Sequence, residues 1–148
     1  MRICVIGAGY VGLVSAACFA EMGNQVTCIE RDSKRFQLLS QGRVPIYEPG
    51  LESLIAAHLN NGQLRFTQDF AEGISQAQVI FIAVGTPSGE DGSADLCHVL
   101  NVAEELGRHI QSRCLIVDKS TVPVGTGERV AQRINRQLAA RDKKFQVN

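Results

Sequence analysis

The sequence predicts an α/β fold, a doubly wound and mainly parallel sheet with helices on both faces. Two observations support this prediction. Short apolar runs alternate with longer amphipathic runs along the whole chain, a pattern typical of βαβ units. A GxGxxG pattern at Gly7–Gly12 directly follows the first apolar run and opens the first helical one. With 148 residues, 45% of them hydrophobic and 20% charged, the chain fits one soluble globular domain.

The first half of the chain is expected to contain three strands and three helices. Arg2–Gly7 is apolar enough for a buried strand. Val11–Met22 is apolar nearly all round, so this helix should lie against the sheet and end at Gly23. Two prolines and the flanking glycines make Arg43–Gly50 a loop. The other predicted elements are a strand at Gln25–Glu30, a helix at Ser33–Ser40, a helix from Leu51 to Leu59 and a strand at Leu64–Thr67.

The second half repeats this alternation. Gln78–Val84 is β-branched and apolar throughout, as expected for a strand covered on both faces. Apolar residues recur at helical spacing from Leu96 to Ile110 and from Val130 to Leu138. The remaining predictions are a helix cap at Asp69, a polar turn at Thr86–Ser93, a strand at Cys114–Asp118 and a further strand beginning at Phe145–Val147.

Composition excludes several functions. The net charge is zero and lysines and arginines form no cluster, so no nucleic-acid surface is expected. The three histidines are scattered and the cysteines form no CxxC pair, so no metal site is expected. Five cysteines without regular spacing indicate reduced thiols and a cytoplasmic protein. Glycines interrupt the apolar run from Ile3 to Ala20, which therefore predicts neither a signal peptide nor a membrane span.

The GxGxxG pattern has the context of a Rossmann-type dinucleotide site. Gly7 permits the tight turn, Gly9 lets the backbone approach a pyrophosphate, and Gly12 lets helix and strand pack closely. Glu30 ends the second strand, about twenty residues on, where an acid can accept the ribose hydroxyls. Its charge would repel a 2′-phosphate, so NAD is predicted over NADP. Arg31 beside it works against this prediction, because arginine can accommodate that phosphate.

Further candidates follow the strands of the second half. A ligand of a doubly wound sheet lies across the carboxyl ends of the strands. Local hydrogen bonding in a turn is the simpler explanation for Thr86 on its own. For Ser120 and Thr121, followed by a proline and a glycine, turn and ligand site are equally good explanations. The residues in question are Gly85, Thr86 and Pro87 after one strand and Lys119, Ser120 and Thr121 after the next.

Five motifs, spread in order over nearly the whole chain, resemble those of the UDP-glucose/GDP-mannose dehydrogenase family. YEPGL, DGSADL and DKSTVPVGT favour the UDP-glucose branch over the GDP-mannose branch, and a GDP-mannose or UDP-N-acetylmannosamine dehydrogenase is the alternative. PIYEPGL and DKSTVPVGT count against a hydroxyacyl-CoA or phosphogluconate dehydrogenase. A non-catalytic dinucleotide-sensing module would have no use for Thr121. The motifs are GAGYVGL at Gly7–Leu13, PIYEPGL at Pro45–Leu51, VGTP at Val84–Pro87, DGSADL at Asp91–Leu96 and DKSTVPVGT at Asp118–Thr126.

The resemblance implies a two-step, four-electron oxidation of UDP-glucose to UDP-glucuronate, with two NAD molecules used in turn. Glu30 would hold the adenosine ribose where the family more often has aspartate, and Arg35 matches a basic cofactor contact. Thr121 would be catalytic and position water, since its hydroxyl both donates and accepts. The expected cofactor residues are Gly7, Gly9, Tyr10, Val11, Gly12, Glu30, Arg35, Thr86, Ser120 and Thr121.

The resemblance also implies a longer protein. The family's Pro-Glu-Phe-Leu segment and its catalytic Cys, Lys, Asn and Asp have no match before Asn148. We therefore expect residues 1–148 to be an NAD-binding domain, with a central helix and a C-terminal UDP-sugar domain beyond it. This domain should bind NAD without turning over alone. The full-length protein is expected to bind UDP-glucose through those missing parts and to form a homodimer or larger assembly.

Overall fold

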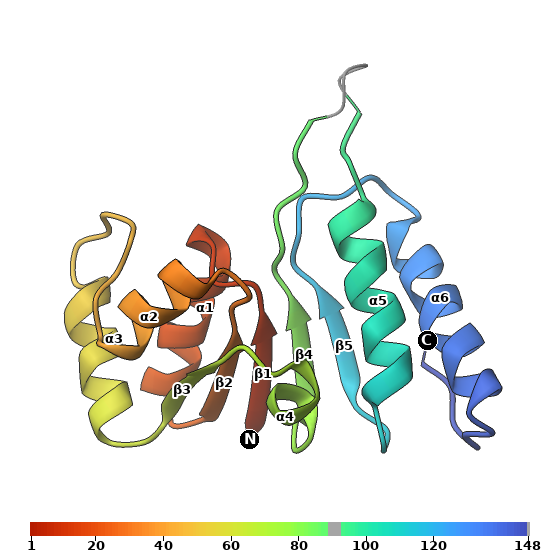
Figure 1. Ribbon diagram of the computed structural model, residues 1–148, viewed down its shortest axis with the longest axis horizontal. Coiled ribbons are helices and arrows are strands. Elements are labelled where there is room, and N and C mark those ends of the chain that lie inside the picture. Colours follow the sequence, from red (N-terminus) through yellow and green to blue (C-terminus); the bar gives the residue numbers. More distant parts are fainter. Residues whose placement is uncertain (89–92, 148) are drawn as a thin grey trace.

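The computed structural model of the chain describes residues 1–88 and 93–147. Its described residues form a sheet of five parallel strands in the order β3-β2-β1-β4-β5, which confirms the predicted fold class (Figure 1). Every strand predicted before Phe145 is present, within two residues of its expected bounds. The strands are β1 Arg2–Ile6, β2 Gln25–Ile29, β3 Leu64–Thr67, β4 Val79–Ile82 and β5 Leu115–Asp118.

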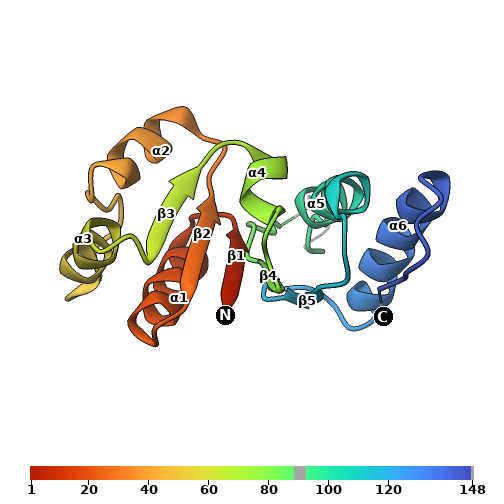
Figure 2. The ribbon, with the colours of Figure 1, turned by 90° about the horizontal axis from the view of Figure 1, so that it is seen from below.

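Helices cover both faces of this sheet, with α1 on one side and α4 and α5 on the other (Figure 2). Side chains alternate along β1, so Ile3 and Val5 pack with α1 whereas Cys4 and Ile6 pack with α5. Each face therefore has its own apolar core. The helices are α1 Tyr10–Glu21, α2 Ser33–Ser40, α3 Leu51–Asn60, α4 Phe70–Ile74, α5 Cys97–His109 and α6 Thr126–Ala140.

The order of the strands reverses at β1. The chain first runs outward from β1 through β2 to β3, then crosses back through α4 to place β4 on the other side of β1. The predicted helix cap at Asp69 is confirmed, because its carboxylate accepts the Glu72 N–H at 2.9 Å and starts α4. A reversal of this kind leaves a crevice at the carboxyl ends of β1 and β4, where ligands of doubly wound sheets bind.

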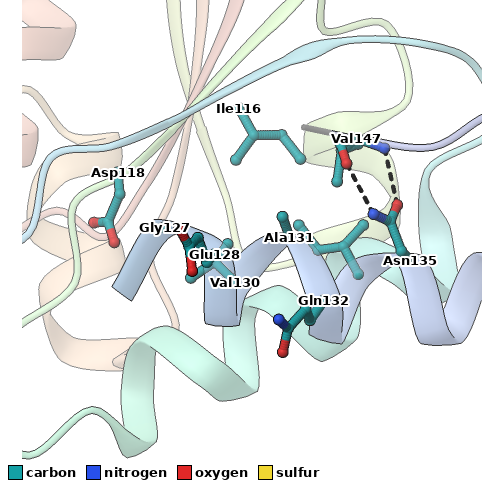
Figure 3. A pocket seen from close by; sticks show the side chains of 10 residues that line it. Ile116, Asp118, Gly127, Glu128, Val130, Ala131, Gln132, Asn135 and Val147 are labelled. Atoms are coloured by element: carbon teal, nitrogen blue, oxygen red, sulfur yellow. Dashed lines mark hydrogen bonds between the residues drawn. The ribbon is translucent and has the colours of Figure 1, made fainter. Parts of the chain in front are cut away.

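The expected strand at Phe145–Val147 is wrong. These residues form no strand in the described structure. The Asn135 side chain instead pairs with the backbone of Val147, donating to its carbonyl at 2.8 Å and accepting its N–H at 2.9 Å (Figure 3). Val147 is buried in the core on the α5 and α6 side. Its apolar pattern thus reflected burial rather than pairing with a strand.

The polar turn predicted at Thr86–Ser93 lies partly outside the described residues, as do Asp91 and Gly92 of the DGSADL motif. Around this gap Ser88 forms an antiparallel bridge with Ala94, and Asp95 N–H bonds to Pro87 O at 2.8 Å. All five cysteines lie in described segments and are free thiols. Among residues 1–88 and 93–147, no cluster of three acidic, histidine or cysteine residues could hold a metal ion, and no helix is long and apolar enough to cross a membrane.

Candidate functional site

The turn between β1 and α1 is packed too closely for side chains at two of its glycines. Gly7 has a φ of +102°, and a Cβ there would lie 2.6 Å from the Ala83 carbonyl oxygen. A Cβ at Gly12 would lie 1.8 Å from the Gly7 carbonyl oxygen. The turn is also tied to β2, because Gly7 N–H donates to Ile29 O at 3.0 Å. Strand, helix and turn can therefore come together only with glycine at these positions.

Gly9 is different, because it borders open space. A Cβ built there meets no described atom within 4 Å. Gly9 is the N-cap of α1, and no side chain of the described residues caps this helix. The first-turn N–H groups of a helix have no acceptor within it and carry its positive dipole end. Room for an anion and unpaired donors thus coincide at one point, which fits a pyrophosphate.

Tyr10 and Val11 follow on the exposed first turn of α1. The Tyr10 hydroxyl donates to Glu48 Oε2 at 2.5 Å, and this hydrogen bond and the Glu48 charge raise the pKa of Tyr10. The bond joins the glycine turn to the Arg43–Gly50 loop. This link could not be predicted from the sequence, because the two residues lie 38 positions apart.

Glu30 lies directly after β2 and is 7% exposed. Asp32 N–H donates to its Oε1 at 2.8 Å, and Arg35 Nη1 lies 3.3 Å from its Oε2. Asp32 in turn caps α2 by accepting Arg35 N–H at 2.8 Å. These contacts fix the carboxylate in place, while each oxygen has a further lone pair for a hydroxyl donor.

A cavity of about 380 Å³ joins Glu30 to the glycine turn. It brings together four of the predicted site residues, namely Gly7, Gly9, Glu30 and Arg35. Its opposite wall comes from α5, which sequence reasoning missed. The available signal was helical spacing, since three α5 residues on this wall recur at i, i+3 and i+4. These residues are His98, Asn101 and Val102.

The structure gathers the other predicted residues in a second group. The Thr86 hydroxyl donates to Thr121 O at 2.9 Å, and the two threonine hydroxyls lie 3.3 Å apart. Ser120 Oγ donates to Val84 O at 2.9 Å. The loops after β4 and β5 therefore lie side by side at the carboxyl edge of the sheet (Figure 1). This group adjoins the cavity through Gly85 and Pro87, the neighbours of Thr86 that line it.

A larger cavity of about 500 Å³ lies elsewhere, between β5 and α6 (Figure 3). Asp118 lines it, and burial raises the pKa of this carboxyl. Within the described part of the chain, Asp118 Oδ2 is buried without a hydrogen-bond partner. The smaller cavity combines the glycine turn with Glu30, an arrangement that can hold a dinucleotide.

Comparison with known proteins agrees with this geometry. The profile described as the NAD binding domain of the UDP-glucose/GDP-mannose dehydrogenase family matches residues 1–148. The chain belongs to this family. Its cofactor is accordingly NAD, and the open Gly9 turn beside Glu30 fits that dinucleotide.

Two relatives in this family are UDP-glucose 6-dehydrogenases. The enzyme of Pseudomonas aeruginosa is 63% identical over 147 residues, which are 99% of this chain and 32% of that protein. The enzyme of Rhizobium meliloti is 46% identical over 143 residues, which are 96% of this chain and 33% of that protein. The chain thus spans about a third of the length of these relatives.

Solved structures of the family show the same fold. A GDP-mannose dehydrogenase of Pseudomonas aeruginosa in a ternary complex superposes with a TM-score of 0.91 at 36% identity, covering 100% of this chain and 35% of that one. A UDP-glucose dehydrogenase of Pyrobaculum islandicum superposes with a TM-score of 0.87 at 38% identity, covering 99% and 34%.

Proposed function

We propose that residues 1–148 are the NAD-binding domain of a dehydrogenase that oxidises UDP-glucose to UDP-glucuronate in two NAD-dependent steps. The observation that carries this proposal is the shared cavity of Glu30 and the glycine turn, at the reversal of strand order. The 63% identity to a UDP-glucose 6-dehydrogenase supports this sugar over GDP-mannose, whose solved dehydrogenase is 36% identical.

Each residue near the cavity has a role in this proposal. The backbone of Gly7–Gly12, including Tyr10 and Val11, binds the pyrophosphate at the N-terminus of α1. Glu30 accepts the hydroxyls of the adenosine ribose. Arg35 supports Glu30 through its 3.3 Å contact and stands at the cavity wall. The adenine lies towards α5.

In this proposal the loops after β4 and β5 lie beside the end of the cofactor that accepts the hydride. NAD, when bound, supplies the hydride acceptor for the oxidation. Thr86 contacts the cofactor and orients the Thr121 loop through its hydrogen bond to the Thr121 carbonyl. Ser120 holds this loop against β4. Thr121 positions water through its exposed hydroxyl.

Residues outside this chain complete the reaction in this proposal. A central helix and a C-terminal domain bind UDP-glucose and supply the remaining catalytic groups, and the whole protein works as a homodimer or larger assembly. Hydride transfer needs the substrate held against the cofactor, so residues 1–148 alone bind NAD without turnover. The five free thiols support a cytoplasmic location.

Calorimetric titration with NAD and with NADP tests the binding role. The wild-type chain should bind NAD at least about tenfold more tightly than NADP, because a 2′-phosphate would face the buried Glu30 carboxylate. Glu30→Ala should lose most of this preference. Glu30→Asp keeps a carboxylate and is the matched control, so it should still favour NAD. Equal binding of both dinucleotides by the wild-type chain would contradict the proposal.

A fusion tests whether this domain supports the proposed two-step oxidation. The chain is joined to the remaining part of the Pseudomonas aeruginosa UDP-glucose 6-dehydrogenase, and NADH formation is followed with UDP-glucose and with GDP-mannose. Two NADH per UDP-glucose, with none from GDP-mannose, is the expected result. No NADH from UDP-glucose with a folded fusion would contradict the proposal. Residues 1–148 without the fusion should form no NADH.

A further inference from the structure

Arg31 is placed beside the ribose site but is turned away from it. It follows Glu30 directly and lines the same cavity. Its guanidinium pairs with the Glu105 carboxylate of α5. The guanidinium carbon also lies 5.7 Å from the centre of the buried Phe70 ring. One cationic side chain thus spans from the end of β2 to α4 and α5.

The backbone of Arg31 is held as well. Gln68 Nε2 donates to the Arg31 carbonyl at 3.1 Å and to Ser33 Oγ at 3.1 Å. Because these bonds fix the main chain, the guanidinium can change its position only by rotating its own side chain. Its two partners, a carboxylate and an aromatic face, then decide where it rests.

An arginine next to the acid of a dinucleotide site is the residue that accommodates a 2′-phosphate in NADP-binding proteins. Here a carboxylate competes for it. We propose that Glu105 is a specificity-determining positioning residue, which secures the preference for NAD by holding Arg31 against α5 and away from the ribose edge. This inference rests on the proposed ribose role of Glu30. The preference for NAD then has two sources: the Glu30 carboxylate repels a 2′-phosphate, and Glu105 keeps the Arg31 cation from binding that phosphate.

The chain offers a matched control one residue away. Glu104 is also on α5, but its carboxylate faces α6 and lies 3.3 Å from Arg133 Nη1 and from Gln137 Nε2. Both acids are partly exposed and both contact an arginine. Replacing either one removes one negative charge from the same helix. Of these two acids, only Glu105 contacts Arg31, one of the two arginines that line the dinucleotide cavity.

The test is the ratio of the NADP to the NAD dissociation constant, measured by calorimetry. Glu105→Gln should lower this ratio about tenfold, because a freed Arg31 gains a charge-assisted hydrogen bond to the 2′-phosphate. Glu104→Gln should leave the ratio unchanged. In the double variant R31A/E105Q the ratio should return to the wild-type value, since the freed cation is gone.

Other outcomes separate this inference from the proposed function. If Glu105→Gln weakens NAD and NADP equally, Glu105 merely shapes the cavity and the inference is overturned while NAD binding stands. A lowered ratio that persists in R31A/E105Q overturns it too, because Arg31 is then not responsible. If the folded wild-type chain binds neither dinucleotide, the proposed function itself fails and takes the inference with it. Circular dichroism shows that each variant is folded.

Discussion

The Thr86 hydroxyl donates a 2.9 Å hydrogen bond to the Thr121 carbonyl oxygen and so joins the loop after β4 to the loop after β5. From the sequence, local turn bonding is the simpler explanation for Thr86, yet the partner of its hydroxyl lies 35 residues away in the other loop. Ser120 reinforces the same junction from the β5 side. The two loops are therefore one structural unit at the carboxyl edge of the sheet.

Thr86→Val should loosen this unit, because it removes the donor and keeps the shape of the side chain. A single hydrogen bond of this kind contributes about 1 kcal/mol to the local free energy of opening. Amides from Ser120 to Gly125 should exchange with deuterium about fivefold faster, while those of β1 remain protected. Thr86→Ser keeps the hydroxyl and should exchange as the wild type does. Unchanged exchange in Thr86→Val would show that the bond contributes nothing to the order of the loop.

Alanine substitutions at Gly9 and Gly12 should separate an effect on NAD affinity from an effect on the free energy of unfolding. Gly12→Ala places a Cβ 1.8 Å from the Gly7 carbonyl oxygen, so α1 must shift and the free energy of unfolding should fall by about 3 kcal/mol. Gly9→Ala meets no described atom within 4 Å and should change the free energy of unfolding by less than about 1 kcal/mol. Its methyl group would instead occupy the space of the pyrophosphate, lowering NAD affinity at least about tenfold.

Urea unfolding and NAD titration of both variants check this pair. The expected pattern is a large loss of stability in Gly12→Ala and a loss of binding alone in Gly9→Ala. The assignment of the pyrophosphate to the Gly9 turn is wrong if Gly9→Ala binds NAD as the wild-type chain does.

Sequence reasoning predicted the parts of the site whose constraints are local. The positions of Gly7, Gly12 and Glu30 were predictable because a tight turn, a closely packed helix and an acid after the second strand each follow at a fixed spacing; the ribose role of Glu30 stays a prediction. The same was true of the strands, whose buried faces appear directly as apolar runs. The predicted cap at Asp69 likewise depended only on the next turn of chain.

What escaped prediction depends on contacts between distant segments. The α5 wall and the Arg31–Glu105 pair arise from the crossover that brings α5 opposite the end of β2, and 74 residues separate the two partners. The strand at Val147 was predicted wrongly because an apolar residue buried against a helix and one in a strand look alike in sequence. Only the packing of Asn135 against its backbone distinguishes them.

Asp118→Asn should stabilise the chain near neutral pH. Burial raises the pKa of the Asp118 carboxyl, so its protonated form is favoured in the folded state. Proton binding by Asp118 therefore stabilises the folded state fully below the ordinary aspartate pKa of about 4. This stabilisation is lost as the pH rises through the raised folded-state pKa. Asparagine is neutral throughout, so the variant should have the higher Tm at pH 7 and lose this advantage below about pH 4.

Thermal unfolding as a function of pH checks this prediction. Glu128→Gln removes an exposed carboxylate that lines the same cavity and is the control, for which no gain at pH 7 is expected. A lower Tm for Asp118→Asn at neutral pH would mean that the charged carboxylate stabilises the fold, against the direction of its pKa shift.

The Tyr10–Glu48 bond should be visible in the titration of tyrosine. The chain has two tyrosines, so Tyr47→Phe leaves Tyr10 as the sole phenol, and its ultraviolet absorbance reports its ionisation. The hydrogen bond to Glu48 and the Glu48 charge raise the pKa of Tyr10, which should titrate above the ordinary value of about 10. In this background Glu48→Gln should lower the pKa towards that value.

The raised pKa of Tyr10 also sets the pH above which its hydrogen bond to Glu48 no longer joins the glycine turn to the Arg43–Gly50 loop. Because the folded-state pKa is raised, the bond stabilises the fold fully below about pH 10 and is lost as the pH rises through the folded-state value. Glu52→Gln is the matched control, since Glu52 accepts Val44 N–H of the same loop at 3.1 Å, whereas the Tyr10 hydroxyl donates to Glu48. This substitution should leave the pKa of Tyr10 raised. If Glu52→Gln and Glu48→Gln lower the pKa of Tyr10 equally, the negative charge of the loop as a whole raises this pKa, and the 2.5 Å hydrogen bond to Glu48 does not.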